Sequence, residues 1–213
     1  MFSSPSTSSD AQAAQSPPEG CLRRFFLPPF SVVLVSIFLF LGLSRLNTGQ
    51  AESLAQSQPS NNLPQEGIAP LFTPEVQAWE EKILAWSDQY HLDPNLVATV
   101  MQIESCGYNK AQSGAGAMGL FQVMPYHFQD GEDPFHPGTN ARRGLKYLRM
   151  AQESGKDTKL TLAGYNGGIT GAQKPQEDWS AEMNRYVYWG YQIYQDAKAG
   201  LDSSSRLTEW LNS

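Results

Sequence analysis

The sequence predicts an all-α domain, and three observations lead to this prediction. First, apolar residues recur at helical steps of three and four. The earliest such stripe consists of Val76, Trp79, Ile83 and Trp86. Second, helix starts are marked by a capping residue followed by proline, as at Thr73-Pro74. Third, after residue 73 no convincing length of sequence alternates between apolar and polar residues as a half-buried strand does.

The elements are expected in the following order. A first helix begins at Thr73-Pro74, and a second begins at Asp93-Pro94 and carries Glu104 near its end. Small residues follow at 113–119 and predict a loop. Apolar spacing then predicts helices over 140–150, 160–166 and 182–199. Gly167-Gly168 ends the middle one, because glycine readily adopts the backbone conformation that stops a helix.

The segments around this helical domain have different compositions. Residues 1–24 are rich in Ser, Pro and Gln and are expected to be a disordered cytoplasmic leader. Residues 25–43 are nineteen residues without a charge, close to the ~20 that cross a bilayer, and predict a transmembrane signal-anchor. Residues 44–72 predict a flexible linker. The domain then spans 73–200, and 201–213 form a tail or a short helix.

The apolar stretch has a second interpretation. After Pro28-Pro29 it is only fourteen residues long, which is typical of a signal peptide. A possible cleavage site at Gly49-Gln50-Ala51 lies far from it, with Arg45 between them, so an uncleaved anchor is favoured. Under both interpretations Arg23-Arg24 stays in the cytoplasm and the chain after residue 45 is exported, on the outer (periplasmic or wall-facing) side of a bacterial cell membrane.

Composition excludes some functions. A net charge of −6 and a pI near 5.0 argue against nucleic-acid binding. Arg142, Lys146 and Arg149 share one helix face, which is expected to be solvated. No His or Cys cluster has metal-ligand spacing, so neither a metal nor a cofactor is expected. Cys21 and Cys106 flank the apolar stretch, so no disulfide is expected between them, and Cys106 is interpreted as a packed thiol.

Glu104 is the candidate catalytic residue. Val97, Val100 and Met101 lie seven, four and three positions before it, which places its carboxyl on the same helix face as three apolar side chains. Apolar surroundings raise the pKa of a carboxyl, so that it can donate a proton near neutral pH. The alternative is an ordinary glutamate that turns from the helix end to solvent.

Other candidates are weaker alone. Gln122 follows the glycine-rich loop and offers a fixed amide. Tyr165 and Asn166 end a helix, either as a plain cap or as a polar pair in a cleft. The aromatic set from Tyr186 to Tyr194 cannot all be buried on one side of a helix, so some rings are expected at a groove or in solvent.

Taken together, these motifs resemble a known family. In chain order they are Glu104-Ser105, the run 113–122 leading to Met124-Pro125, then 140–148, 163–168 and Tyr186-Val187. They occur in the order and approximate spacing of the family 1 lytic transglycosylases, the soluble-lytic-transglycosylase-like domain. The departures are modest: Phe121 stands where Met or an aliphatic residue is usual, and Gly164 where Ala is common.

The resemblance implies a lysozyme-like helical fold that acts on peptidoglycan. It implies that Glu104 is the single acid and base, and that the bond between N-acetylmuramic acid and N-acetylglucosamine is cleaved with formation of a 1,6-anhydro ring. Ser105, Gln122, Tyr165, Asn166 and Tyr186 would then orient the substrate or the carboxyl. Asp130, Glu132 and Asp133 are the nearest candidates for a second carboxylate, in a loop that looks solvated.

Two rivals remain open. One is a goose-type lysozyme-like muramidase that hydrolyses the same bond. The other is a non-catalytic peptidoglycan-binding module, against which the presence of Glu104 argues. Protein partners and oligomeric state do not follow from the sequence.

Overall fold

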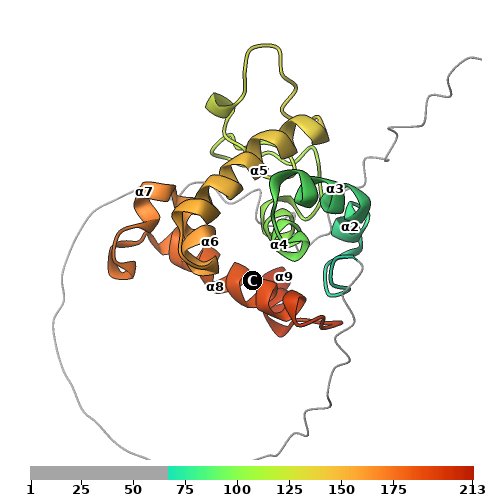
Figure 1. Ribbon diagram of the computed structural model, residues 1–213, viewed down its shortest axis with the longest axis vertical. Helices are drawn as coiled ribbons and strands as arrows, with labels where there is room; N and C mark the ends of the chain where they lie inside the picture. The colour runs from blue at the N-terminus through green and yellow to red at the C-terminus, as the bar shows by residue number, and fades with distance from the viewer. Residues whose placement is uncertain (1–66) are drawn as a thin grey trace, which may run out of the picture.

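The computed structural model describes residues 67–213, in which helix α4 (Pro94–Ser105) lies at the centre (Figure 1). It packs against α2 (Pro74–Gln77), α3 (Glu80–Tyr90) and α8 (Ala181–Lys198). The remaining elements are η1 (Pro125–His127), α5 (Pro137–Ser154), α6 (Thr158–Gly167), α7 (Ile169–Ala172), η2 (Gln176–Asp178) and α9 (Ser205–Asn212). Within the described residues there are isolated β-bridges but no strand, so the all-α class is confirmed.

Helix α4 is buried on most of its surface. Val97, Val100 and Met101 are each 0% exposed, as expected for a helix that others surround. Its start is where the sequence predicts it, because the Asp93 side chain accepts hydrogen bonds from the backbone N–H groups of Asn95 (2.8 Å) and Leu96 (3.4 Å). The capped start and the buried face together hold the C-terminal end of α4 in a defined place.

The first predicted helix is in fact two helices. α2 ends at Gln77 and α3 begins at Glu80, with Trp79 in a non-helical conformation between them. The indole N–H of Trp79 donates to the carbonyl of Gly107 at 2.8 Å, and this bond is buried. Trp79, between α2 and α3, is therefore hydrogen-bonded to the segment that follows α4.

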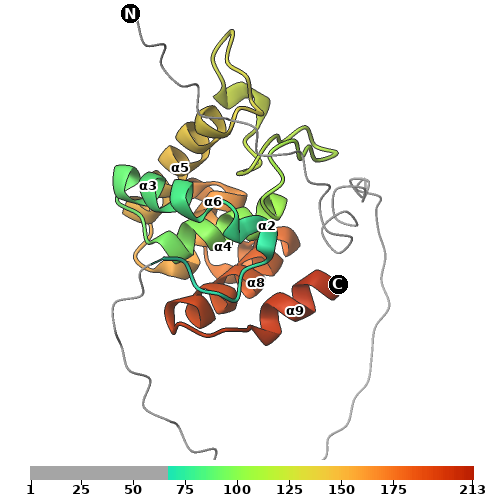
Figure 2. The same ribbon diagram turned by 90° about the vertical axis from the view of Figure 1, so that its right-hand side faces the viewer.

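One expected boundary differs from the structure, at the start of the domain. Ile68, Ala69, Leu71 and Phe72 are buried in the core, and the Ala69 N–H donates to Asn95 Oδ1 at 2.7 Å. Residues 67–72 are thus part of the packed domain, and the expected linker 44–72 extends too far. Four of these six residues are apolar, and burying them in the core is favourable. The short-helix alternative for 201–213 is correct, since α9 lies against α8 (Figure 2).

The expected transmembrane segment 25–43 lies outside the described residues, as does the leader 1–24. From residue 67 onward, no helix has both the length and the apolar character needed to cross a bilayer. Cys106 is disulfide-bonded, so the interpretation as a packed free thiol is wrong. The chain contains one other cysteine, Cys21, which lies outside the described residues.

Candidate active site

The C-terminal end of α4 opens into a cleft of about 500 Å³. Its walls come from the end of α4, the segment that follows it, the middle of α5, the end of α6 and the start of α8. The polar side chains that line it include Glu104, Gln122, Arg143, Asn166 and Glu182. Residues far apart in the sequence therefore meet here around one carboxyl, that of Glu104.

Glu104 is half-buried at this cleft. Burial raises its pKa to about 8, the Tyr186 hydroxyl lowers it somewhat, and the negative charge of Glu182 raises it again. Loss of hydration outweighs the single favourable contact because a carboxylate held against apolar helix surface has little water around it. The expected rise in pKa is confirmed, and Glu104 is largely protonated at neutral pH.

Tyr186 lies beside Glu104 in α8 and is 7% exposed. Its hydroxyl is near enough to the Glu104 carboxyl to lower the pKa of that carboxyl, but it makes no hydrogen bond to any described residue. Burial and the nearby negative charge raise the pKa of Tyr186 well above its ordinary value, so the hydroxyl keeps its proton. Tyr186 can therefore stabilise the charged form of Glu104.

Ser105 does not line the cleft. Its side chain is 0% exposed, and its hydroxyl donates to the carbonyl of Leu120 at 2.7 Å while accepting from the Gly107 N–H at 3.2 Å. These bonds fix the chain of residues 120–122 against the end of α4. The structure thus gives Ser105 a supporting position rather than contact with a ligand.

Tyr165 lies next to Glu104 but directs its hydroxyl elsewhere. The hydroxyl donates to the carbonyl of Phe121 at 2.7 Å. Gly144 of α5 makes this possible, since a Cβ there would lie 2.6 Å from the Phe121 Cβ and 3.2 Å from the Tyr165 hydroxyl. Burial, together with the charge of Glu104, raises the pKa of Tyr165 well above its ordinary value, so it stays a donor.

Asn140 joins the loop to α5, and sequence reasoning gave it no specific role. Its side chain is buried, accepts from the Phe121 N–H at 2.8 Å, and donates to the carbonyls of Met118 (2.7 Å) and Pro134 (2.9 Å). Gly119, at φ +75°, leaves room for this amide, which a Cβ would strike. Gly119 therefore makes room for the Asn140 side chain.

Gln122 and Asn166 both line the cleft. The Gln122 amide nitrogen donates to the carbonyls of Gly119 (3.0 Å) and Ala111 (3.2 Å). Both of its hydrogens are thereby used, and its amide oxygen remains as an acceptor. The Asn166 amide makes no hydrogen bond to any described residue, and it can donate and accept in the cleft.

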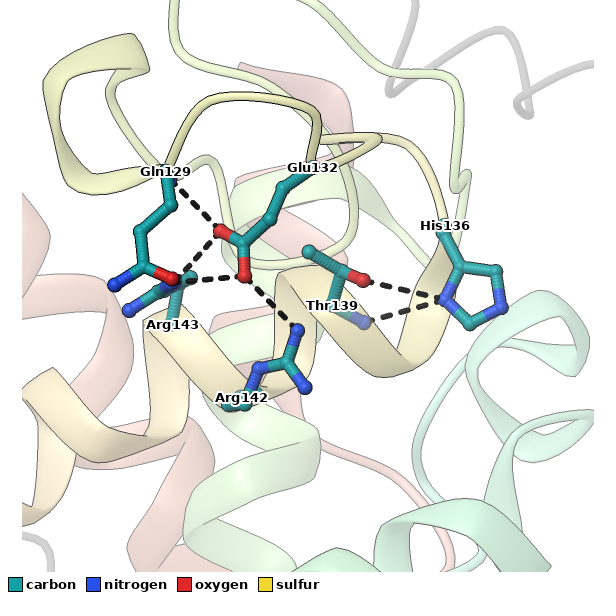
Figure 3. A network of polar contacts seen from close by, with 6 residues as sticks. All are labelled: Gln129, Glu132, His136, Thr139, Arg142 and Arg143. Atoms are coloured by element: carbon teal, nitrogen blue, oxygen red, sulfur yellow. Dashed lines mark hydrogen bonds and ion pairs between the residues drawn. The ribbon is translucent and has the colours of Figure 1, made fainter.

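The second carboxylate of the cleft is not one that the sequence analysis named. Asp130, Glu132 and Asp133 do not line the cleft, whereas Glu182, in the first turn of α8, does. Glu132 is tied to Arg142 and Arg143 (Figure 3). Only a tertiary contact between α4 and α8 brings Glu182 near Glu104, so the sequence held no local signal for it.

Aromatic rings line one side of the cleft as a continuous series. The ring centroids of Tyr126 and His127 are 4.5 Å apart, those of His127 and Tyr147 5.7 Å, and those of Tyr147 and Tyr165 6.1 Å. All four residues line the cleft, and Tyr126 is 74% exposed. The rings expected at a groove within 186–194 are mostly packed in the core, with Tyr188 exposed on α8.

Comparisons with known proteins find similarity over part of the chain. The family model of the transglycosylase SLT domain matches residues 81–185. A protein described as "transglycosylase" from Enterobacteria phage PRD1 is 38% identical over 110 residues, which are 51% of this chain and 40% of that relative. An inactive mutant of lytic transglycosylase Slt from Pseudomonas aeruginosa is similar in structure, with a TM-score of 0.46 at 20% identity. That match covers 57% of this chain and 24% of the other.

Proposed function

Because residues 81–185 match the family model of the transglycosylase SLT domain, we propose that this chain is a peptidoglycan lytic transglycosylase. It cleaves the β-1,4 bond between N-acetylmuramic acid and N-acetylglucosamine and leaves 1,6-anhydromuramoyl ends. The observation that supports this best is the position of Glu104, a carboxyl with a pKa of about 8 at a cleft with sugar-sized dimensions.

In the first step Glu104 acts as the general acid. Its proton passes to the glycosidic oxygen, the bond from that oxygen to C1 of the muramoyl unit breaks, and the departing N-acetylglucosamine carries a new hydroxyl. The acetamido oxygen of the muramoyl unit stabilises the positive charge at C1. The Tyr186 hydroxyl stabilises the carboxylate that Glu104 has become, since a donor favours the charged form.

In the second step the same Glu104 acts as the base. It takes the proton of the C6 hydroxyl while the C6 oxygen bonds to C1, which closes the anhydro ring and restores the protonated acid. No water enters the product, and one side chain serves in both steps. Gln122 accepts from an N–H or O–H of the glycan, and Asn166 holds a neighbouring amide or hydroxyl. Tyr165 and Ser105 act indirectly, because they hold residues 120–121 in place.

Glu182 supports one alternative. A second carboxylate in the cleft is what a hydrolase would use to activate water, as in a goose-type lysozyme-like muramidase. Glu182 is exposed in the first turn of α8, which is a usual place for an acidic residue, because the helix N-terminus is electropositive. Transglycosylation therefore remains the proposal, with hydrolysis as the outcome to exclude.

The test is product analysis of digested sacculi by mass spectrometry with wild type, Glu104→Gln and Glu182→Gln. Anhydromuramoyl ends are expected from wild type and Glu182→Gln. For Glu104→Gln we expect a fall in kcat of about 10²–10⁴-fold, the usual contribution of a general acid. Reducing ends that depend on Glu182 would replace the proposal by the hydrolase. Unchanged activity of Glu104→Gln would exclude Glu104 as the acid.

We further propose that the catalytic domain is exported. The basic pair Arg23-Arg24 before an apolar stretch supports export. Anchoring by 25–43 places Cys21 in the cytoplasm. Peptide mapping under non-reducing conditions decides this point: a Cys21–Cys106 peptide would show that 25–43 does not separate the two by a membrane.

A further inference from the structure

The cleft contains one fixed positive charge that the proposed reaction does not use. Among its described lining residues, Glu104 and Glu182 carry carboxyls and Arg143 carries a guanidinium. The chain as a whole has a net charge of −6, and wall polymers are themselves anionic, so general attraction between them is poor. A local cation at the cleft is therefore where an anionic substrate gains most.

Arg143 is held in one orientation by Glu132. Its Nε donates to Oε2 at 2.9 Å and its Nη2 donates to Oε1 at 2.8 Å, a paired geometry that leaves its side chain 21% exposed. A guanidinium has five N–H donors, of which Glu132 takes two. No other described residue accepts from Arg143, so its remaining donors are available on the cleft side.

Glu132 is in turn fixed by other groups (Figure 3). It accepts from the Gln129 N–H at 2.9 Å and from Arg142 Nη2 at 3.0 Å. The hydrogen bond from Arg143 comes first among the causes that lower the pKa of Glu132 to about 2, and so the carboxylate stays charged at any physiological pH. One carboxylate is shared by two guanidinium groups, which leaves this cluster of Glu132, Arg142 and Arg143 net positive.

The basic face expected from the sequence is not the relevant one. Arg149 is engaged with Glu153 and the carbonyl of His91, and Lys146 is exposed and does not line the cleft. Arg143, which lies off that face, is the residue that reaches the cleft because α5 turns this side toward Glu104.

We propose that Arg143 binds a carboxylate of the wall polymer and thereby selects and positions the glycan strand. This rests on the proposed function. Two groups carry the required chemistry: the lactyl carboxylate of a muramoyl unit without a stem peptide, and a carboxylate of the stem peptide. A pre-oriented guanidinium suits either, because it donates two parallel hydrogen bonds to a planar carboxylate.

The test compares Arg143→Gln with the matched control Arg142→Gln in the full chain. Arg142 contacts the same Glu132 carboxylate but is 56% exposed and does not line the cleft. Kinetics are measured on glycan strands with stem peptides and on strands from which an amidase has removed them. We expect Arg143→Gln to raise KM about ten-fold or more on one of the two, the effect of losing a charged hydrogen bond, with kcat little changed.

The substrate that shows the effect identifies the source of the carboxylate. A loss on peptide-bearing strands alone indicates the stem peptide, and a loss on denuded strands alone indicates the lactyl group. Equal KM values for Arg143→Gln and Arg142→Gln on both substrates would overturn the proposal. Equilibrium binding of both strands to Glu104→Gln and to Glu104→Gln/Arg143→Gln separates this from failure of the proposed reaction. Equal affinities there would also overturn it.

Discussion

Glu104 lines the cleft and Glu132 lies outside it, and the environments of these two glutamates shift their pKa values in opposite directions. Burial beside α4 raises the pKa of Glu104 to about 8. The guanidinium groups of Arg143 and Arg142, together with the Gln129 N–H, lower the pKa of Glu132 to about 2. Glu104 is therefore largely protonated at neutral pH, whereas Glu132 is charged.

The difference teaches that the raised and the lowered carboxyl pKa arise on separate elements, the end of α4 and the loop that pairs with α5. The side of α4 offers apolar surface and one hydroxyl, that of Tyr186. The side of α5 offers paired ions near solvent. If an arginine of α5 contacted Glu104 directly, it would lower the pKa of that acid and remove the proton that the proposed reaction needs.

Asn140 of α5 holds the segment 118–121 and Pro134 against that helix, and its loss is the largest stability effect that we expect. Asn140→Ala leaves the Phe121 N–H and the carbonyls of Met118 and Pro134 without their partner. The free energy of unfolding should fall by about 3 kcal/mol, as for other buried groups left unpaired. Urea unfolding measures this. Asn184→Ala is the control, because that amide makes longer, partly exposed bonds; an equal loss in both would contradict the role of Asn140.

Replacing Glu104 should stabilise the domain, increasingly so as pH rises. The folded-state pKa of about 8 lies above the ordinary value of 4.5 for this carboxyl. The folded state therefore binds the proton more tightly than the unfolded state, and it loses stability as pH rises between these two values. Glu104→Gln avoids that loss. Its melting temperature should therefore exceed that of wild type by more at pH 9 than at pH 5.

Glu132→Gln is the matched control for this prediction, with the opposite sign. The pKa of Glu132 is lowered in the folded state, so its contribution to stability is present above about 4.5 and disappears only as pH falls toward 2. Its replacement should lower the melting temperature slightly at both pH 5 and pH 9. A shift for Glu104→Gln that does not change between these two pH values would contradict the assigned pKa.

Tyr186→Phe should have the smallest effect, a displacement of the pH profile. Its hydroxyl lowers the pKa of Glu104, so its removal should move the alkaline limb of kcat above pH 8. A lower maximum is also expected, because the carboxylate formed during the reaction loses its donor. Tyr188→Phe, at an exposed position of the same helix, should leave the profile unchanged. A limb that moves toward lower pH would show that Tyr186 does not act on the acid.

Much of the environment of Glu104 could be predicted from sequence. Apolar spacing before Glu104 implied a buried helix face and a raised pKa, and Asp93-Pro94 marked the start of α4; the structure confirms these points. Such signals are local, because periodicity and caps act within one helix. Glycines at 167–168 ended α6 for the same reason.

The surroundings of Arg143 could not be predicted, because they depend on contacts between residues far apart in the sequence. Arg143 belongs to the cleft only because α5 packs with that side toward Glu104. Glu132, which pairs with Arg143, lies eleven residues earlier in an irregular loop. Asn140 and Gly144 have their roles through Phe121, nineteen or more residues earlier. No repeat or motif announces such contacts.

Helix α9 has a practical consequence for the design of a shorter fragment of this chain. Similarity to the family model stops at residue 185, inside α8. Yet Leu207 and Trp210 of α9 are 4% and 2% exposed, and the Ser204 hydroxyl is bonded to Asp196 at 2.6 Å. A fragment that ends at residue 185 would lack α9 and expose apolar core to water. A stable fragment must therefore reach at least Trp210.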